Sequence, residues 1–452
     1  MSEEQSFDVI VVGAGPAGSM AATTLARAGH KVALIERGAY PGAKNLFGGM
    51  IYSLELVRHF PNFVAEAPIE RPVTRHSTWF LGKDRSLNVD FASESFGDAP
   101  YNGFTAYRSR FDRWLADQAV AAGALLIPST VVDDFLWENG LQGGKGNSTR
   151  RSVAGVVTRR EAGELRAPLV ICADGILSLL GRKAGLVAEP DPEHYSIGVR
   201  ETLSLPKGRI EDRFQIDSNG GCAALFVGSW PGALRGGGFV YTNRDTLSVG
   251  FVAQMASLAE DQGKGGEAGI LDALDAFKRH PAVRRLIQGA ERLEYGAHVV
   301  PEGGWGMRPT MVGNGIMLAG DAAALVLAGG VIYEGVHYAM HSGHLAAETA
   351  IKALERGRFD AVALSGYPRN LEASYVGRNL KAFRHVPRLL FNPRMYHHYP
   401  DALCRVAEEF FRAEEQGHIK LFSLLKRHVV QGGGGLRAFL KDQWHALKAF
   451  FL

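Results

Sequence analysis

Blocks of apolar residues alternate with polar and glycine-rich segments at the start of the chain. Residues 8–12 form a short apolar run rich in β-branched side chains, and residues 31–35 form a second. Between them an alanine-rich segment extends from Ser19 to about Ala28, and Gly29 follows it. Runs of this length and composition predict a strand, a helix and a strand, in that order.

Three glycines and one acid lie at the joints of this unit. Gly13, Gly15 and Gly18 follow the first strand, and Glu36 closes the second. At this spacing the first glycine allows a tight turn, the second lets the backbone approach a pyrophosphate, and the third lets the helix pack close to the strand. The helix N-terminus favours the anion, and the acid suits a ribose hydroxyl. An ordinary glycine-rich turn is the alternative, but strand, helix and acid in register indicate dinucleotide binding.

Two later strand ends also carry an acid. A strand predicted over 164–172 leads into Asp174 and Gly175, and an apolar strand over 315–319 leads into Gly320 and Asp321. A carboxylate at the end of a strand, beside a glycine turn, suits a ribose or phosphate contact. We therefore expect Asp174 to make such a contact, and the isolated carboxylate of Asp321, in an otherwise apolar stretch, to require a specific partner.

A helix is predicted from about residue 107 to 122, because Phe111, Leu115 and Ala119 recur at helical spacing. Arg108 stands at its start. Its guanidinium could brace a pyrophosphate, or it could be a plain exposed arginine. Elsewhere, alternation over 74–91 predicts strands of a second, antiparallel sheet, and the Gly-, Ser- and Asn-rich residues 142–151 predict a loop.

The middle and the end of the chain have different patterns. Short strands and turns are expected over 195–251, and a helix over 267–289. Gly236-Gly237-Gly238 is either a flexible turn or a place where a flat ligand touches bare backbone. The last helix is amphipathic and basic, and it either docks on protein or lies in a membrane interface. Its apolar arc comprises Leu436, Phe439, Leu440, Trp444, Leu447, Phe450 and Phe451.

Composition narrows the functional classes. The chain has 452 residues, 46% of them hydrophobic and 21% charged, which is typical of a globular protein with two or more lobes. A net charge of +3 gives no indication of nucleic-acid binding. The predicted strand at residue 8 leaves no room for a signal peptide. Three dispersed cysteines predict reduced thiols and exclude a four-cysteine cluster held by this chain alone.

Two apparent signals are set aside. The apolar segment 315–333 contains Asp321 and much glycine and alanine, so we do not expect it to span a membrane. His337 and His341 share a face of a predicted helix, but no further ligand is evident, so we expect packed histidines and no metal site.

The motifs in this order resemble FAD proteins of the glutathione-reductase-like superfamily. Four longer stretches resemble the FixC-type subunit of the electron-transfer-flavoprotein:quinone oxidoreductase family. They are Glu211-Asp212-Arg213-Phe214-Gln215, residues 236–243 (GGGFVYTN), residues 278–283 (KRHPAV) and residues 297–302 (AHVVPE). The resemblance covers nearly the whole chain and implies FAD in the glycine loop.

The resemblance implies an α/β fold with an α+β insert. A Rossmann-like FAD-binding domain would comprise residues 1–72, 107–190 and 301–360. An antiparallel-sheet quinone-binding lobe would comprise 73–106 and 191–300. Residues 361–452 would form a helical region that contacts partners or the membrane.

The implied site residues fall into two groups. The quinone would contact Gly236 and Gly237. FAD would contact Gly13, Gly15, Ala17, Gly18, Glu36, Arg37, Lys44, Asn45, Gly49, Arg108, Val132, Asp174, Gly175, Gly320, Asp321, Gly330 and Val331. The loop after Glu36 would run beside the ribityl chain and ring, although a surface loop is the alternative. A helix over about 334–354 could direct its positive end at the flavin pyrimidine.

The implied activity is electron transfer from two NADH-oxidising electron-transfer-flavoprotein subunits, through FAD, to quinone, in an electron-bifurcating complex linked to nitrogen fixation. A separate ferredoxin-like subunit would hold the 4Fe–4S cluster, and the complex would lie on the cytoplasmic face of the cell membrane. His298 and Glu302 are candidates for a proton relay. Glu334 departs from the family pattern, where a basic residue is expected. Alternatives are a geranylgeranyl-reductase-like enzyme, an aromatic hydroxylase, and a scaffold with structural FAD.

Overall fold

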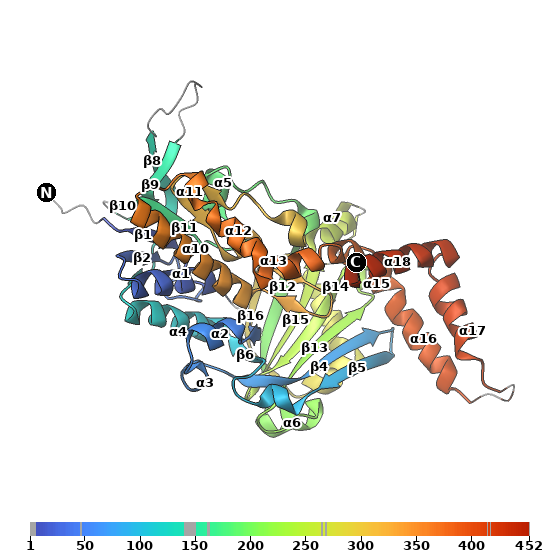
Figure 1. Ribbon diagram of the computed structural model, residues 1–452. Helices are drawn as coiled ribbons and strands as arrows, with labels where there is room; N and C mark the ends of the chain where they lie inside the picture. The colour runs from blue at the N-terminus through green and yellow to red at the C-terminus, as the bar shows by residue number, and fades with distance from the viewer. Residues whose placement is uncertain are drawn as a thin grey trace.

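A computed structural model describes residues 6–45, 48–139, 151–160, 163–263, 265–266, 269–413, 415 and 417–451 (Figure 1). The expected loop at 142–151 therefore lies, but for its last residue, outside the described part of the chain. None of the described helices is both long enough and apolar enough to cross a bilayer.

A six-stranded sheet forms the first layer. Its order is β17 (Val312–Gly313), β18 (Ile316–Leu318), β11 (Leu169–Cys172), β1 (Val9–Val12), β2 (Val32–Ile35) and β7 (Leu125–Ile127). The strands from β18 to β7 are parallel, and their side chains are mostly apolar, as expected where both faces of a sheet are covered. The helices that pack here include α1 (Pro16–Arg27), α4 (Arg108–Ala121) and α10 (Val336–Arg356).

A nine-stranded sheet forms the second lobe. Its order is β16 (Glu291–Pro301), β12 (Tyr195–Ser204), β15 (Thr246–Gln254), β14 (Gly236–Thr242), β13 (Gly221–Gly228), β4 (Arg71–Leu81), β6 (Gly103–Tyr107) and β3 (Gly48–Tyr52), with β5 (Ser86–Ala92) paired to β4. The expectation of an antiparallel sheet is wrong at one place, because β4 and β13 run parallel. They come from segments far apart in sequence, so no hairpin fixes their direction.

Two further expectations for this lobe, one about strands and one about a helix, are also corrected. Residues 195–251 hold long strands and the helix α6 (Lys207–Phe214), where short strands and turns are predicted. Residues 270–287 form two helices, α8 (Ile270–Arg279) and α9 (Pro281–Ile287). The break falls at Pro281, because proline lacks the N–H that would continue α8 and instead begins α9 at its first turn.

Shorter elements complete the two lobes. A three-stranded sheet joins β10 (Glu164–Arg166), β9 (Arg151–Thr158) and β8 (Val132–Asn139), and a two-stranded sheet joins β19 (Leu327–Ala328) and β20 (Tyr333–Glu334). The remaining helices here are α2 (Leu54–His59), α3 (Phe63–Glu66), α5 (Leu179–Lys183) and α7 (Met255–Gly263).

The chain ends in a helical region, as predicted. It comprises α11 (Ala361–Leu364), α12 (Gly366–Ala373), α13 (Tyr375–Ala382), α14 (Val386–Leu390), α15 (Arg394–His397), α16 (Tyr399–Phe411), α17 (Leu421–Leu425) and α18 (Gly435–Phe450). Figure 1 shows α16, α17 and α18 at one end of the molecule, on the far side from the parallel sheet. Contacts from α16 to β4 and β5 join this end to the second lobe.

Candidate functional site

The predicted dinucleotide residues converge on one edge of the parallel sheet. Gly13 follows β1, Glu36 follows β2, Asp174 follows β11 and Asp321 follows β18. Since these strands are parallel, all four positions lie at their carboxyl ends, where open α/β sheets bind ligands. Val132, which begins β8 a few residues beyond the end of β7, approaches the same edge.

The glycine loop has the geometry of a pyrophosphate cradle. Gly13 has φ +100°, and a Cβ there would lie 2.2 Å from the carbonyl oxygen of Ala173. A Cβ on Gly18 would lie 1.8 Å from the carbonyl oxygen of Gly13, so α1 can approach β1 only with glycine here. A Cβ on Gly15 would meet only Arg108 Nη2, at 3.9 Å. The space over Gly15 is open, and its missing side chain leaves N–H groups of the first turn, including that of Ala17, to a ligand.

Glu36 is held beside this loop by two backbone donors. Its Oε2 accepts from the N–H of Ala14 at 3.1 Å, and its Oε1 accepts from the N–H of Gly38 at 2.6 Å. Each carboxylate oxygen retains a further lone pair. The carboxylate is therefore oriented at the sheet edge and can still accept from ribose hydroxyls.

Arg108 is anchored rather than free. Its Nε and Nη2 donate to the two carboxylate oxygens of Asp112 at 2.5 and 2.8 Å, and its side chain is only 13% exposed. The plain exposed-arginine interpretation is therefore wrong. Asp321 lies within electrostatic range: burial raises the pKa of its carboxyl, and the charges of Arg108 and His298 partly offset this. The arrangement places a fixed cation between the glycine loop and Asp321.

The other predicted FAD residues border this edge less tightly. Asp174 accepts from the N–H of Leu180 at 3.1 Å, and the exposed Arg37 acts on its charge. Gly175 and Gly330 have φ of +83° and +84°. The others are Lys44, which is exposed, Asn45 in the same turn, Gly49 opposite Ala106 in β3, Gly320 packed against Ala17, and Val331, which is exposed.

Gly236 and Gly237 lie inside β14, paired with β13 and β15. The flexible-turn interpretation is therefore wrong. A Cβ on Gly236 would lie 2.1 Å from the carbonyl oxygen of Val252, and one on Gly237 would lie 2.7 Å from that of Phe226. Strand packing alone therefore accounts for both glycines. Gly237 shares its face of β14 with Phe239 and Tyr241, whereas Gly238 abuts the ring of Phe277 on the other face.

An apolar wall faces these aromatic side chains. Val331, Ile332 and Tyr333 are 56%, 39% and 41% exposed. Yet burial among protein atoms raises the pKa of Tyr333 well above its usual value, with Glu302, Tyr396 and Tyr241 adding to the shift. The exposed segment 331–333 therefore lies within electrostatic range of Tyr241 on β14. Sequence reasoning missed Tyr241, Tyr333 and Tyr396, which come from three distant segments with no shared motif.

His298 and Glu302 have different surroundings. His298 lies on β16, and desolvation by the surrounding protein lowers its pKa while the charge of Asp321 opposes that change. Glu302 is buried and accepts from Ser196 Oγ at 2.6 Å, and burial raises its pKa. Thus His298 lies near the FAD edge of the site and Glu302 near the apolar wall.

Two family models and several named relatives match this chain. A family model described as FAD dependent oxidoreductase matches residues 8–171, and one described as ETF-QO/FixC family C-terminal domain matches residues 386–451. The chain is 41% identical, over 98% of both chains, to the probable electron transfer flavoprotein-quinone oxidoreductase YdiS of Escherichia coli strain K12. It is 38% identical to Protein FixC of Salmonella typhi, over 95% of this chain and 96% of that one.

The chain belongs to the ETF-QO/FixC family. It is therefore an FAD-dependent oxidoreductase, and the glycine-loop edge has the open cradle and the oriented carboxylate that FAD requires. When bound, FAD supplies the redox chemistry, and the protein supplies binding, orientation and electrostatics.

Solved structures of low identity share the fold. A geranylgeranyl bacteriochlorophyll reductase-like protein from Thermoplasma acidophilum superposes with a TM-score of 0.69 at 20% identity, covering 94% of this chain and 96% of that one. The myxobacterial halogenase CndH gives a TM-score of 0.60, also at 20% identity, covering 93% of this chain and 86% of that one. These likenesses support the predicted α/β architecture.

The family's C-terminal domain contains α18, whose two faces differ. Ala446 and Ala449 pack on the cluster formed by Val386 and Leu389 of α14. Asp442 on this side is buried and accepts from Arg394, Tyr399 and Asn392. The predicted apolar arc is mostly left exposed: Leu436 61%, Leu440 56%, Trp444 51%, Leu447 42%, Phe450 46% and Phe451 79%.

Proposed function

We propose that this chain is the FAD- and quinone-binding subunit of an electron-bifurcating electron-transfer-flavoprotein complex. It would take electrons from an NADH-oxidising flavoprotein partner and pass them to quinone. The observation that carries the proposal is the exposed apolar segment of Val331, Ile332 and Tyr333, which follows the Gly320-Asp321 turn, precedes α10 and lies within electrostatic range of Tyr241. Exposed apolar side chains beside aromatic ones suit a flat, apolar ring with polar groups at its ends.

The relatives support the same activity. The relative that matches this chain over 98% of its length is named a probable electron transfer flavoprotein-quinone oxidoreductase, and several others are named FixC. By contrast, the geranylgeranyl reductase-like protein is only 20% identical. The difference in identity favours quinone reduction over saturation of an isoprenoid.

The position of the cysteines supports a partner that holds the iron–sulfur cluster. Cys172 ends β11, Cys222 lies in β13 and Cys404 lies in α16, and each is a buried free thiol. A 4Fe–4S cluster needs four thiolates gathered at one place. We therefore assign the cluster to a ferredoxin-like subunit, and electron delivery to two electron-transfer-flavoprotein subunits.

Protons are part of the reaction, because a quinone that accepts two electrons takes up two protons to become the quinol. Glu302 lies close enough to Tyr333 and Tyr396 to act on their pKa values, and burial raises the pKa of its own carboxyl, so it can hold a proton beside Tyr333. His298 would exchange a proton at the FAD side, where Asp321 and Arg108 face it.

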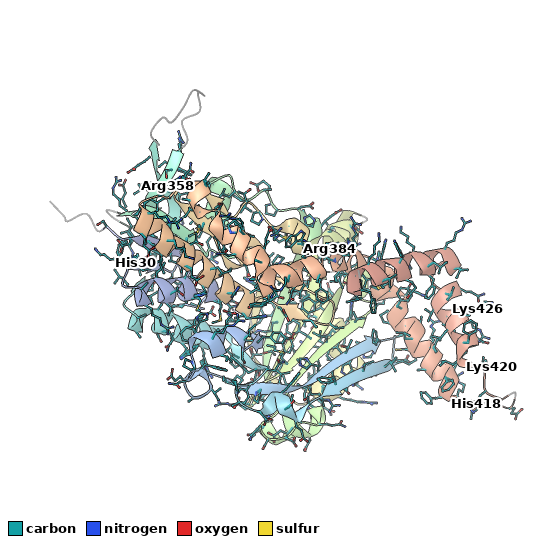
Figure 2. All side chains as sticks on the ribbon, in the orientation of Figure 1. His30, Arg358, Arg384, His418, Lys420 and Lys426 are labelled. Atoms are coloured by element: carbon teal, nitrogen blue, oxygen red, sulfur yellow. The ribbon has the colours of Figure 1, made fainter. Side chains whose placement is uncertain are left out.

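The exposed face of α18 supports peripheral attachment to the cytoplasmic face of the membrane. Its apolar arc includes Trp444 and is flanked by Arg437, Lys441 and Lys448 on the same helix. Figure 2 shows Lys420 and Lys426 at the outer edge of the same end of the molecule. Apolar side chains beside cations are the features of a helix that lies in an anionic lipid interface.

Co-sedimentation with anionic lipid vesicles tests the membrane assignment. Replacing Leu440 and Trp444 with serine removes apolar area without disturbing Ala446 and Ala449, so binding should fall at least tenfold. A Val362→Ser variant is the control, since Val362 is 72% exposed on α11, far from α18 (Figure 1). Equal binding of the double variant and wild type would assign the apolar arc to a protein partner.

Quinone reoxidation of the isolated protein tests the central activity. The FAD-loaded protein is reduced chemically without oxygen and mixed with a water-soluble quinone while its visible absorbance is followed. The proposal predicts rapid return of the oxidised spectrum and formation of quinol in equal amount. Reoxidation by ferricyanide but not by quinone would contradict it.

A further inference from the structure

A row of titratable side chains crosses the interior between α2, α10 and α13. On α10, His337, His341, His344 and Glu348 lie at helical spacing on one face. The eleven residue-to-residue steps from His337 to Glu348 rise about 16 Å along the helix axis. This row passes from the start of α10, beside the FAD edge, to a partly exposed carboxylate.

The inner end of the row lies at the ligand site. Gly320, in the predicted FAD-binding turn, packs against Ala339 of α10 and donates from its N–H to Ser342 Oγ at 2.8 Å. Just before α10, Glu334 Oε2 lies 3.5 Å from His337 Nε2. Burial opposes ionisation of Glu334, yet hydrogen bonds with His337 and Tyr338 lower its pKa overall. This pair places a carboxylate beside an imidazole at the start of α10.

Tyr52 and Tyr375 flank that inner pair. The ring of Tyr52 lies 5.2 Å from that of His337, and Tyr52 lies within electrostatic range of both Glu334 and Tyr241. Since Tyr241 shares its face of β14 with Gly237, the row reaches the face of β14 that carries Gly237. On the other side Tyr375 stacks parallel to His337 at 6.0 Å.

Glu55 of α2 is the centre of the row. Its carboxylate is fully buried and accepts from Tyr375 Oη at 3.2 Å and Arg58 Nη1 at 2.7 Å. Its Oε2 lies 3.3 Å from His341 Nδ1 and 3.4 Å from His59 Nε2. Burial raises its pKa, but the polar contacts with His341 and His59 and the charge of Arg58 outweigh burial and lower the pKa overall, so the carboxyl is ionised.

The outer end reaches solvent through two histidines. The rings of His59 and His344 lie 4.4 Å apart. His344 Nε2 lies 3.5 Å from Glu348 Oε1, and Thr24 Oγ1 of α1 lies 3.2 Å from its Nδ1. The side chains of His344 and Glu348 are 22% and 42% exposed. Burial and the charge of His59 lower the pKa of His344, while Glu348 and Glu55 oppose them.

A purely structural ion pair explains only part of this arrangement. Arg58 alone neutralises Glu55, so the two imidazoles beside that carboxylate, those of His59 and His341, are surplus to charge balance. Both ring nitrogens of His341 and Oε2 of Glu55 are buried without an aligned hydrogen-bond partner among the described residues. Buried polar atoms without a hydrogen-bond partner lower the stability of the fold, so their presence calls for an explanation. A proton that moves along the row would give each of these atoms a hydrogen-bond partner in turn.

We propose that Glu334, His337, His341, Glu55, His59 and His344 form a proton relay from solvent at Glu348 to the FAD and quinone site. The proposal rests on the proposed function. Two electrons reach the quinone through FAD, and two protons enter from water, which balances conversion to the quinol. Each imidazole accepts a proton on one nitrogen and releases one from the other, while the ionised Glu55 stabilises the cationic form.

The test uses the FAD-loaded, chemically reduced protein and two acceptors. Quinone takes two protons with its two electrons, and water supplies those that the reduced flavin does not, whereas ferricyanide takes electrons only and the flavin protons would leave to water. H344N and E55Q should slow reoxidation by quinone at least tenfold, the lower part of the range for a positioned proton donor, and leave ferricyanide rates within twofold. Free imidazole should restore the H344N rate, and E55D should restore part of the E55Q rate.

H30N is the matched control, because His30 is also 22% exposed beside a carboxylate, and Figure 2 shows it at the far edge of the molecule. Its quinone rate should match wild type. A second readout needs no turnover: C2-hydrogen exchange of His344, followed by mass spectrometry, should show a lower pKa in E55Q, because Glu55 raises it.

Three results would overturn the relay. If H344N and E55Q are reoxidised by quinone at the wild-type rate, these residues carry no proton to the quinone. If the His344 exchange profile is unchanged in E55Q, Glu55 and His344 are not coupled. Equal loss with both acceptors would show a structural role only. A wild-type protein that reacts with ferricyanide but not with quinone would instead contradict the proposed function, and the relay with it.

Discussion

Substitutions in the glycine loop separate the cost of packing from the loss of cofactor. In Gly15→Ala the new methyl group meets only Arg108 Nη2, at 3.9 Å, and φ is −78°, which alanine tolerates. Alanine is a poorer N-cap than glycine by up to about 1 kcal/mol. Alanine also restricts the unfolded chain more than glycine does, and this stabilises the fold by about 0.4–1 kcal/mol, which offsets the loss at the N-cap. The apoprotein should therefore keep nearly wild-type stability.

The same methyl group points into the space over α1 where the pyrophosphate would lie. We expect G15A to lose FAD binding by at least a hundredfold. Gly18→Ala is the contrasting variant, because its methyl group would lie 1.8 Å from the carbonyl oxygen of Gly13. Overpacking of this kind costs about 1–3 kcal/mol or more, so G18A should lose stability as well as FAD.

The assay measures thermal unfolding of the wild-type, G15A and G18A apoproteins, and the FAD content of each after reconstitution. Gly208→Ala controls for glycine replacement away from the site, since Gly208 lies in the helix α6 and an added Cβ there has no neighbour within 4 Å. If G15A binds FAD as wild type does, the pyrophosphate does not lie over this loop, and the placement of FAD at the sheet edge is wrong.

Three further predictions concern single side chains. Glu36→Ala should weaken FAD binding about tenfold or more in a fluorescence titration, because charged hydrogen bonds contribute about 1.5–3 kcal/mol; unchanged affinity would exclude a ribose contact. His298→Ala should slow quinone reduction and leave FAD content intact, whereas unchanged turnover would remove His298 from proton transfer. Asp442→Asn should loosen α18, seen as faster hydrogen exchange over 435–450 relative to a Gln443→Ala control.

Acid should reproduce the effect of Asp442→Asn. Burial opposes ionisation of Asp442, but hydrogen bonds from Arg394 and Tyr399 lower its pKa overall. A carboxyl with a lowered folded-state pKa contributes stability above its unfolded value, about 3.9, and loses it as the pH falls through the folded value. Exchange over 435–450, corrected for intrinsic pH dependence, should therefore rise below about pH 4 in wild type. A flat profile would contradict the role of this ion pair.

The FAD half of the site could be predicted because its signals are local. Gly13, Gly15, Gly18 and Glu36 lie within one β-α-β unit, and Asp174 and Asp321 each follow a strand of the same sheet. Parallel strands bring their carboxyl ends together whatever the loops between them contain. The amphipathic arc of α18 was equally readable from spacing, but which of its faces stays exposed depends on α14.

The second lobe could not be predicted as well, because its contacts join distant segments. The parallel pairing of β4 with β13 links residues about 150 positions apart, and nothing in either strand specifies its direction. Tyr241, Tyr333 and Tyr396 meet only in three dimensions. Likewise, Glu55 gives no signal in sequence, since its meaning depends on His341 and Tyr375 packing against α2.

Anaerobic mixing of the FAD-loaded protein with NADH, and then with NADPH, tests the central claim most directly. If the chain receives electrons only through flavoprotein partners, neither nucleotide alone will bleach the visible flavin absorbance, and bleaching will follow when the reduced electron-transfer-flavoprotein subunits are added. Rapid bleaching by either nucleotide alone would show that the chain accepts hydride itself, and an independent reductase or hydroxylase would replace the proposed function.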